Sequence, residues 1–136
     1  MEQRINFVTL VVADLAASRR FYVDGLGWGT SLEAPDEVAM IRVGDKLVLS
    51  LWAQAHAELE IGPVTRGGTL PFTLAYNTAS EAEVDEVLRT ALAAGATVSA
   101  ALKRDWGGYS GYFTDPDGFR WEIAYNPFPI GDLRLP

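Results

Sequence analysis

Two charged side chains near the C-terminal end of the chain are placed where they could do chemistry. Glu122 and Arg120 belong to the stretch Phe119–Tyr125, in which large apolar residues alternate with polar or small ones. This alternation predicts a β-strand, and residues two apart in a strand point to the same face. We therefore expect the carboxylate and the guanidinium side by side on one face. There they could bind a polar ligand, or the carboxylate could act as a general base.

Three roles are open for Glu122. In the structural role, which the sequence favours, Arg120 pairs with the carboxylate and both side chains serve the scaffold. In the second role, the carboxylate binds a cation or a hydrogen-bond donor of a ligand. In the third, it removes a proton from a substrate.

A tight turn comes directly before this strand. In Asp115–Gly118, Pro116 fixes φ at the first central position, and Gly118 suits the left-handed conformation that closes a hairpin. The preceding stretch, 108–114, predicts the partner strand, and the glycines at its start predict a bulge or sharp curl. Glu122 is thus expected mid-strand in an antiparallel hairpin.

Each half of the chain predicts the same series of elements: a strand, a helix and three more strands. In the first half the strands are 5–12, 28–33, 38–43 and 46–52, with a helix from Asp14 to about Asp24. In the second half the strands are 70–77, 97–103, 108–114 and 119–125, with a helix that is capped by Ser80 and Glu83 and ends near Ala94.

Residues repeat as well as elements. Asn6–Val12 aligns with Leu70–Tyr76 through a shared Thr-Leu pair, and Leu47–Trp52 aligns with Phe119–Ala124. The chain is therefore predicted to be one α+β domain of two βαβββ modules, at 1–60 and 66–127. A linker at 53–68, with a short helical piece, joins them, and a tail follows at 127–136.

Composition excludes several classes of function. The 136 residues include no cysteine, so disulfides, thiolate nucleophiles and cysteine metal sites are excluded. A net charge of −7 disfavours nucleic-acid binding, which needs a basic patch. Neither a membrane span nor a secretory signal is recognisable. We expect a soluble cytoplasmic protein that has neither nucleic acid nor membrane as a partner.

The turn that delivers Glu122 resembles the C-terminal motif of the vicinal oxygen chelate superfamily, which includes glyoxalase I, bleomycin-resistance proteins and extradiol dioxygenases. The stretch Phe7–Tyr22, followed by Gly25-Leu26-Gly27-Trp28, resembles the opening strand and helix of that superfamily. The resemblance covers nearly the whole chain. It implies a glyoxalase-like fold in which the sheets of two modules curl around a shared cavity.

The resemblance also implies where metal ligands would stand. In this sequence those positions are Phe7, Ser50 (or Leu49 if the alignment shifts by one), Pro71 and Glu122. Only the last is a ligand of the usual kind, and a divalent ion needs three or four converging donors. We therefore predict that the protein holds no metal and needs no cofactor. The single histidine, at position 56, falls in the predicted linker.

The cavity walls follow from the alignment of the modules and from neighbouring aromatic residues. The predicted ligand-binding residues are Phe7, Thr9, Ser50, Trp52, Thr73, Trp106, Tyr109, Tyr112, Arg120 and Glu122. For Trp52 and Trp106, pocket and core are equally compatible with the sequence. Tyr76 and Trp121 are predicted to be core residues under the helices.

These features favour a metal-independent protein that binds a small planar or cationic organic molecule between the modules. The alternative is an enzyme of the lyase, isomerase or dioxygenase kind that uses Glu122 with a tyrosine or Arg120 in place of a metal. A third interpretation is a protein–protein module that has kept only the scaffold. In each case the resemblance implies a homodimer.

Overall fold

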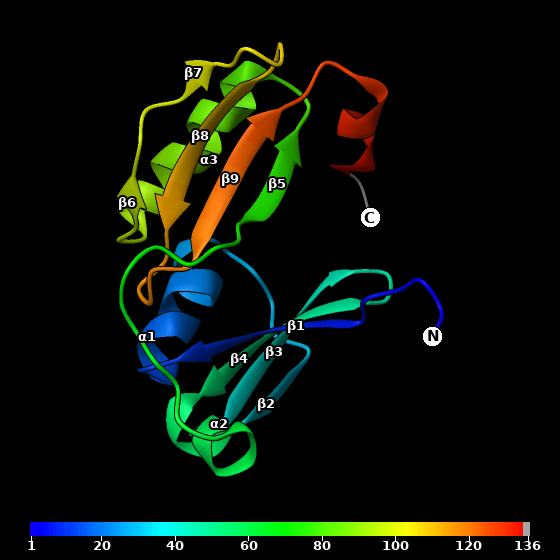
Figure 1. Cartoon of the computed structure of the whole chain (residues 1–136). Coiled ribbons are helices and arrows are strands. Elements are labelled where there is room, and N and C mark those ends of the chain that lie inside the picture. Colours follow the sequence, from blue (N-terminus) through cyan, green and yellow to red (C-terminus); the bar gives the residue numbers. More distant parts are fainter. Residues whose placement is uncertain (135–136) are drawn as a thin grey trace. The chain divides into compact units, whose positions relative to one another are not determined.

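The computed structural model describes residues 1–134. The chain forms two compact units, the first ending at Gly67 and the second beginning at Gly68. Each unit has its own β-sheet and helices, and Figure 1 shows both. We call them the first and the second module. The predicted α+β fold class is confirmed.

The first module has one mixed sheet of four strands in the order β1-β4-β3-β2. Strand β1 is parallel to β4, and the other neighbours are antiparallel. Its elements are β1 (Phe7–Val12), α1 (Leu15–Arg19), the π-helical turn η1 (Arg20–Gly25), β2 (Leu32–Ala34), β3 (Val38–Gly44), β4 (Leu47–Ala53) and α2 (Gln54–Ile61).

The core of the first module lies on the face of the sheet that α1 covers. Asp14 begins the helix, as predicted, and its Oδ1 accepts a hydrogen bond from the backbone N–H of Ala17 at 2.9 Å. The helix continues directly as the π-helical turn η1, in which the side chains of Phe21 and Tyr22 are 3% and 0% exposed. Alternate strand residues complete the core: Leu10, Val12, Ala39, Ile41, Leu49 and Leu51.

The second module repeats this arrangement with a longer helix. Its strands lie in the order β5-β9-β8-β6, β7 also pairs with β8, and β5 is parallel to β9. The elements are β5 (Leu74–Thr78), α3 (Glu81–Ala93), β6 (Thr97–Val98), β7 (Leu102–Lys103), β8 (Tyr109–Thr114), β9 (Arg120–Tyr125) and the 3-10 helix η2 (Pro129–Arg134).

Helix α3 covers one face of this sheet, as Figure 1 shows. The predicted cap is confirmed: the Ser80 hydroxyl accepts from the N–H of Glu83 at 3.2 Å, and the Glu83 carboxylate accepts from the N–H of Ala79 at 2.8 Å. The buried residues from the helix and from the strands are Val84, Leu88, Ala91, Phe113, Trp121 and Ile123.

Two glycines make room for neighbouring side chains. A Cβ atom at Gly111 would lie 2.6 Å from Cδ1 of Leu88, so glycine lets α3 approach β8 closely. A Cβ atom at Gly108 would lie 1.8 Å from the Trp106 ring. The predicted bulge is absent from β8, which pairs with β9 in unbroken register from Tyr109 to Thr114.

The turn between β8 and β9 has the predicted geometry. Gly118 adopts a φ of 87°, and its N–H donates to the carbonyl of Asp115 at 3.0 Å. The Asp115 carboxylate accepts from the N–H groups of Asp117 and Phe119 at 3.0 and 2.9 Å. The turn fixes the register of the hairpin, so Tyr112 lies opposite Glu122.

The segment that joins the modules contains more regular structure than the sequence predicts. Residues Gln54–Ile61 form α2, an eight-residue helix that packs on β1 and β4. Its Ala57 is fully buried, and Gly62 ends the helix with a φ of 84°. The irregular part of the segment therefore starts only after this glycine.

Several other elements depart from their predicted bounds. Strand β2 begins at Leu32 and β5 at Leu74, each four residues late, and the stretch 97–103 forms two short strands. The prediction of Tyr76 as a core residue is wrong, because β5 is an edge strand and this side chain is 44% exposed. Within residues 1–134, no helix is long and apolar enough to cross a membrane.

Candidate functional site

The second module gathers polar side chains on the face of its sheet that α3 does not cover. We call this the open face of the second module. Strand β9 contributes Arg120 and Glu122, and β8 contributes Ser110, Tyr112 and Thr114. These residues share a face because side chains alternate along a strand, and their neighbours Phe113 and Trp121 lie in the core under α3.

Glu122 is bound by the residue opposite it. The Tyr112 hydroxyl donates to Oε1 of Glu122 at 3.1 Å. The expected pairing of Glu122 with Arg120 is not observed, since no ion pair or hydrogen bond joins the two within residues 1–134. Residues two apart along a strand are about 6.6 Å apart, whereas directly opposed residues are about 4.5–5.5 Å apart, so the cross-strand partner is the closer one.

Arg104 closes the cluster from a loop. Its guanidinium donates to the hydroxyl and to the carbonyl of Ser110, at 2.9 and 2.8 Å. It also lies over the ring of Tyr112, 5.6 Å from the centroid. Ser110 is fully buried, so the arginine satisfies polar groups that water does not reach. The cluster is therefore a chain of contacts from Ser110 through Arg104 and Tyr112 to Glu122.

Tyr112 is held in its protonated form. Burial raises the pKa of its phenol above the ordinary value of 10.0, and the neighbouring Glu122 carboxylate raises it further by charge and by hydrogen bonding. Arg104 and Arg120 act in the opposite direction but are weaker influences. At neutral pH the phenol is thus a hydrogen-bond donor toward Glu122.

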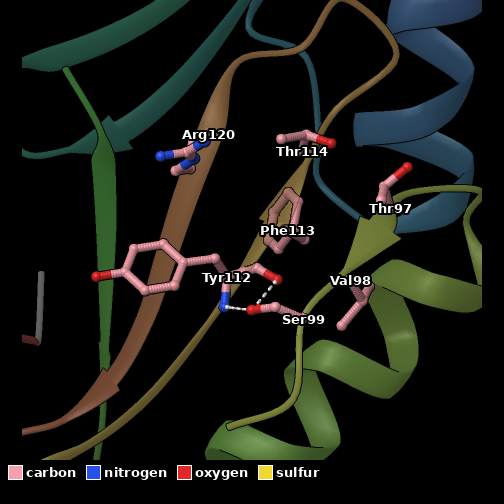
Figure 2. A pocket seen from close by; sticks show the side chains of 7 residues that line it. All are labelled: Thr97, Val98, Ser99, Tyr112, Phe113, Thr114 and Arg120. Carbon is pink, nitrogen blue, oxygen red and sulfur yellow. Dashed lines mark hydrogen bonds between the residues drawn. The ribbon is translucent and has the colours of Figure 1, made fainter. Parts of the chain in front are cut away.

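A pocket of about 340 Å³ adjoins the cluster on the side of β6. Figure 2 shows the residues that line it: Thr97, Val98, Ser99, Tyr112, Phe113, Thr114 and Arg120. The Ser99 hydroxyl accepts from the N–H of Tyr112 at 3.1 Å and so extends the pairing of β6 with β8. Arg120 lies in the lining, and its guanidinium forms no hydrogen bond or ion pair within the described residues.

Three further predicted binding residues of this module lie outside the cluster. Tyr109 is on the helix side, where its hydroxyl donates to Asp85 of α3 at 2.9 Å and this hydrogen bond raises the pKa of the phenol. Thr73 is exposed and precedes β5. Trp106 is 43% exposed, and its ring lies against Gly108.

The remaining predicted binding residues belong to the first module. Phe7, Thr9, Ser50 and Trp52 share the sheet face that α1 does not cover, which we call the open face of the first module. Phe7 is 54% exposed, whereas Ser50 is buried. On this face Ser50 lies opposite Thr9, whereas Leu49 lies in the core. Of these two candidates for the ligand position of this strand, Ser50 is therefore the one on the open face.

The strand pairing corrects the alignment of the two modules. In the first module Thr9 lies opposite Ser50, and in the second Ala75 lies opposite Glu122. Since Ser50 and Glu122 are equivalent, Thr9 corresponds to Ala75 and Phe7 to Thr73. The sequence alignment was therefore two residues out, a shift that preserves the faces because strands have a period of two. The residue equivalent to Phe7 is Thr73 instead of Pro71.

The side chains at the four ligand positions that the resemblance implies do not fit a divalent ion. With Thr73 in place of Pro71, these positions are Phe7, Ser50, Thr73 and Glu122. After this correction they are one carboxylate that is bound by Tyr112, two hydroxyls and a phenyl ring. Neutral hydroxyls are poor ligands for zinc and its neighbours, which take imidazole, thiolate or carboxylate groups. Across residues 1–134, no three His, Cys, Asp or Glu residues lie together in a way that could hold a metal ion.

Sequence reasoning missed Arg104, Ser110 and Ser99 as members of this site. A signal for part of the cluster was available, because residues at equal distances from Asp117, the centre of the loop Pro116–Gly118, face each other across this hairpin. That rule alone would have placed Tyr112 opposite Glu122. Nothing comparable identifies Arg104, whose position depends on the path of the loop before β8.

Comparisons with known proteins agree with this architecture. Residues 4–123 match the sequence model of the Glyoxalase/Bleomycin resistance protein/Dioxygenase superfamily. A solved glyoxalase-related enzyme from Fulvimarina pelagi is 34% identical, with a TM-score of 0.84 over 93% of this chain and 90% of its own. A glyoxalase/bleomycin resistance protein/dioxygenase from Nocardioides is 26% identical, with a TM-score of 0.77 over 92% and 84%.

A lactoylglutathione lyase from Agrobacterium tumefaciens shares the fold, with a TM-score of 0.70 at 24% identity over 93% of this chain and 96% of its own. No protein of curated function matches the sequence.

Proposed function

The chain belongs to the Glyoxalase/Bleomycin resistance protein/Dioxygenase superfamily, and on that premise we propose that it binds a small organic molecule without a metal ion. The ligand would lie on the open face of the second module. Membership confirms the resemblance seen in the sequence. The expectation that the ligand also contacts Phe7, Thr9, Ser50 and Trp52 of the first module stays a prediction.

The observation that supports this proposal most strongly is the cluster of Arg104, Tyr112 and Glu122 beside a pocket of about 340 Å³. Small-molecule sites are typically about 300–1,000 Å³ and combine apolar or aromatic walls with a few fixed polar groups. Here a hydrogen bond between Tyr112 and Glu122 and the contact of Arg104 with the tyrosine ring fix these groups before any ligand arrives. Such preorganisation lowers the entropy cost of binding.

Independence from metal rests on the chemistry of the donors. The four positions that would carry ligands offer a single carboxylate, which already accepts from Tyr112. We expect dialysed protein to contain far less than one equivalent of zinc, nickel, manganese or iron by elemental analysis. Close to one tightly held ion per chain would refute this part of the proposal and reopen metal-assisted chemistry.

A thermal-shift screen tests the binding proposal. Protein dialysed against EDTA is screened with a library of small organic acids, bases and neutral aromatic compounds. A true ligand raises the melting temperature by an amount that grows with the logarithm of its concentration relative to Kd. Any hit is then tested on Arg120→Gln and Glu122→Gln, whose charge changes match those of the control variants Arg89→Gln and Glu86→Gln on the exposed face of α3.

We expect the two site variants to weaken the shift caused by a hit and the two control variants to leave it unchanged. If all four variants respond like the wild type, the ligand binds elsewhere and the proposed site is wrong.

An enzyme that uses Glu122 is the second candidate. One observation favours it: the Tyr112 phenol and the Glu122 carboxylate are in direct hydrogen-bond contact, which makes a proton donor and a proton acceptor available at one place. The similar protein from Fulvimarina pelagi is also described as a glyoxalase-related enzyme. Long incubation of each screening hit separates the two functions. Catalytic consumption that is lost in Glu122→Gln supports the enzyme, and an unchanged hit supports binding.

The homodimer is also a proposal at this stage. It rests on the family arrangement, since equal repeats can pair within a chain or between chains. Light scattering at high micromolar concentration tests it directly, and a strict monomer there would contradict it.

A further inference from the structure

We infer that the ligand of the second module is an organic acid whose carboxylate binds Arg120. This inference rests on the proposed function and adds the chemical class of the ligand. From the sequence and the family resemblance we expected a planar or cationic molecule. The structure favours an anion instead, since the carboxylate of Glu122 already has a partner, whereas the guanidinium of Arg120 has none among the described residues.

Arg120 places a cation in the lining of the pocket. Its side chain is partly buried in the lining of the pocket and makes no hydrogen bond or ion pair with any described residue. Several other arginines are paired, for example Arg19 with Glu33 at 3.0 Å and Arg42 with Asp45 at 2.8 Å, and Arg20, which has no partner among the described residues, is exposed to solvent. A partly desolvated cation without a partner is unfavourable, so an anion in the pocket would be stabilised.

Positive side chains outnumber negative ones in the cluster and the pocket lining. Among the described side chains, those of the cluster and the pocket lining include two guanidinium groups, on Arg104 and Arg120, and one carboxylate, on Glu122. The face is therefore locally positive on a chain whose net charge is −7. A positive patch attracts anionic ligands to this place. Cations are attracted to the acidic remainder of the surface instead.

The guanidinium of Arg120 and the side chains around it suit a planar carboxylic acid. A guanidinium presents parallel N–H groups that match the two oxygens of a carboxylate. The hydroxyls of Thr97 and Thr114 also belong to the lining. Tyr112 also lines the pocket, and Figure 2 shows its ring on the side of the view away from Thr97 and Val98. An aromatic ring in the lining suits a planar ligand body. An aromatic or otherwise planar carboxylic acid fits this combination.

A nuclear magnetic resonance titration tests the inference. Full-length protein labelled with ¹⁵N is titrated with 2-naphthoate, 2-naphthylmethanol and 2-naphthylmethylammonium, which share a planar body and differ in charge. The backbone amides of Ser99, Tyr112 and Thr114 report on the pocket. The same titrations are run on Arg120→Gln, on Arg120→Lys and on the charge-matched control Arg89→Gln.

We expect 2-naphthoate to shift the pocket amides and to bind about tenfold to hundredfold more tightly than the alcohol, the difference made by a charge-assisted hydrogen bond. Arg120→Gln should remove this preference, Arg120→Lys should keep part of it, and Arg89→Gln should keep all of it. The amide spectrum of each variant shows whether it is folded, and Arg120→Lys tests the inference if Arg120→Gln is not.

The other outcomes separate this inference from the proposed function. If the alcohol or the ammonium compound binds the pocket as tightly as 2-naphthoate, the carboxylate assignment is wrong and small-molecule binding stands. The same holds if Arg120→Gln leaves the preference for 2-naphthoate intact. If none of the three probes shifts the pocket amides at millimolar concentration, the proposed function fails together with the inference.

Discussion

The two modules share a scaffold but differ in what their sheets present to a ligand. Each has a sheet in which the first strand is parallel to the last, and each buries alternate strand residues under a capped helix. The open face of the first module has Phe7, Thr9 and Ser50. At the corresponding place, the second module has the connected cluster of Tyr112 and Glu122.

This difference shows that the fold and the site depend on different residues. Helix caps and core positions are alike in the two modules, because each module must bury one face of its sheet. The open faces carry no such constraint, and only that of the second module has a connected cluster with charged side chains among the described residues.

The largest effect is expected at Gly111. Gly111 lies opposite Ile123, and in the first module Ala39 lies opposite Leu51, the residue equivalent to Ile123. Ala39 is therefore the equivalent of Gly111. Gly111→Ala should destabilise the protein by about 1–3 kcal/mol, because the added Cβ would lie 2.6 Å from Leu88 in a packed core. Urea unfolding measures the change. Gly29→Ala, where nothing lies within 4 Å, is the control and should change stability by less than about 0.5 kcal/mol.

Arg104 and Arg42 allow a comparison of the two open faces. Arg104→Met should cost about 1–2 kcal/mol, because it leaves the buried hydroxyl and carbonyl of Ser110 without their donor. Arg42 binds the carbonyl of Gly44 and the carboxylate of Asp45 in its own exposed turn, so Arg42→Met should cost less than about 0.5 kcal/mol. Equal losses in the two variants would show that the cluster on the second module is no more structured than an ordinary surface.

The helix caps should behave alike in the two modules. Asp14 and Ser80 each accept a hydrogen bond from a backbone N–H three residues later, at 2.9 and 3.2 Å. Asp14→Ala and Ser80→Ala should each lower the free energy of unfolding by about 1 kcal/mol. Thermal or urea unfolding gives both values. A loss confined to one variant would contradict the view that the scaffold is built in the same way twice.

The smallest effect concerns pH. Because the folded-state pKa of Tyr112 is raised, its contribution to stability is complete below pH about 10 and is lost as the pH rises through the folded-state pKa. Glu122→Gln should lower this pKa, since it removes the carboxylate that opposes ionisation. Titration of ¹³C-labelled tyrosines follows the change. Asp85→Asn is the matched control and should lower the pKa of Tyr109 while leaving Tyr112 unaffected.

Much of the fold could be predicted from the sequence, because local rules determine it. Alternating residues gave the strands, Asp14 and Ser80 gave the helix starts, and Pro116 with Gly118 gave the hairpin. Strand ends were predicted less well. The first residues of the predicted strand 70–77 include Pro71, which has no N–H to donate to a neighbouring strand, and β5 starts after it.

The site could be predicted only in part, because its contacts are made between segments. The face shared by Arg120 and Glu122 followed from the period of a strand, but the partner of Glu122 is set by the register across the hairpin. Arg104 reaches Ser110 through a loop whose path no local pattern determines. The sequence thus located the charged residues correctly, but it paired Glu122 with the wrong neighbour.

The central claim, that this member of the family binds a small molecule without metal, is tested most directly by calorimetry. The strongest hit of the thermal-shift screen is titrated into the protein in buffer with EDTA and, separately, in buffer with zinc, nickel or manganese. We predict affinities that agree within about threefold, a difference of less than about 0.7 kcal/mol. Binding that appears only when one of these metal ions is added would contradict the account.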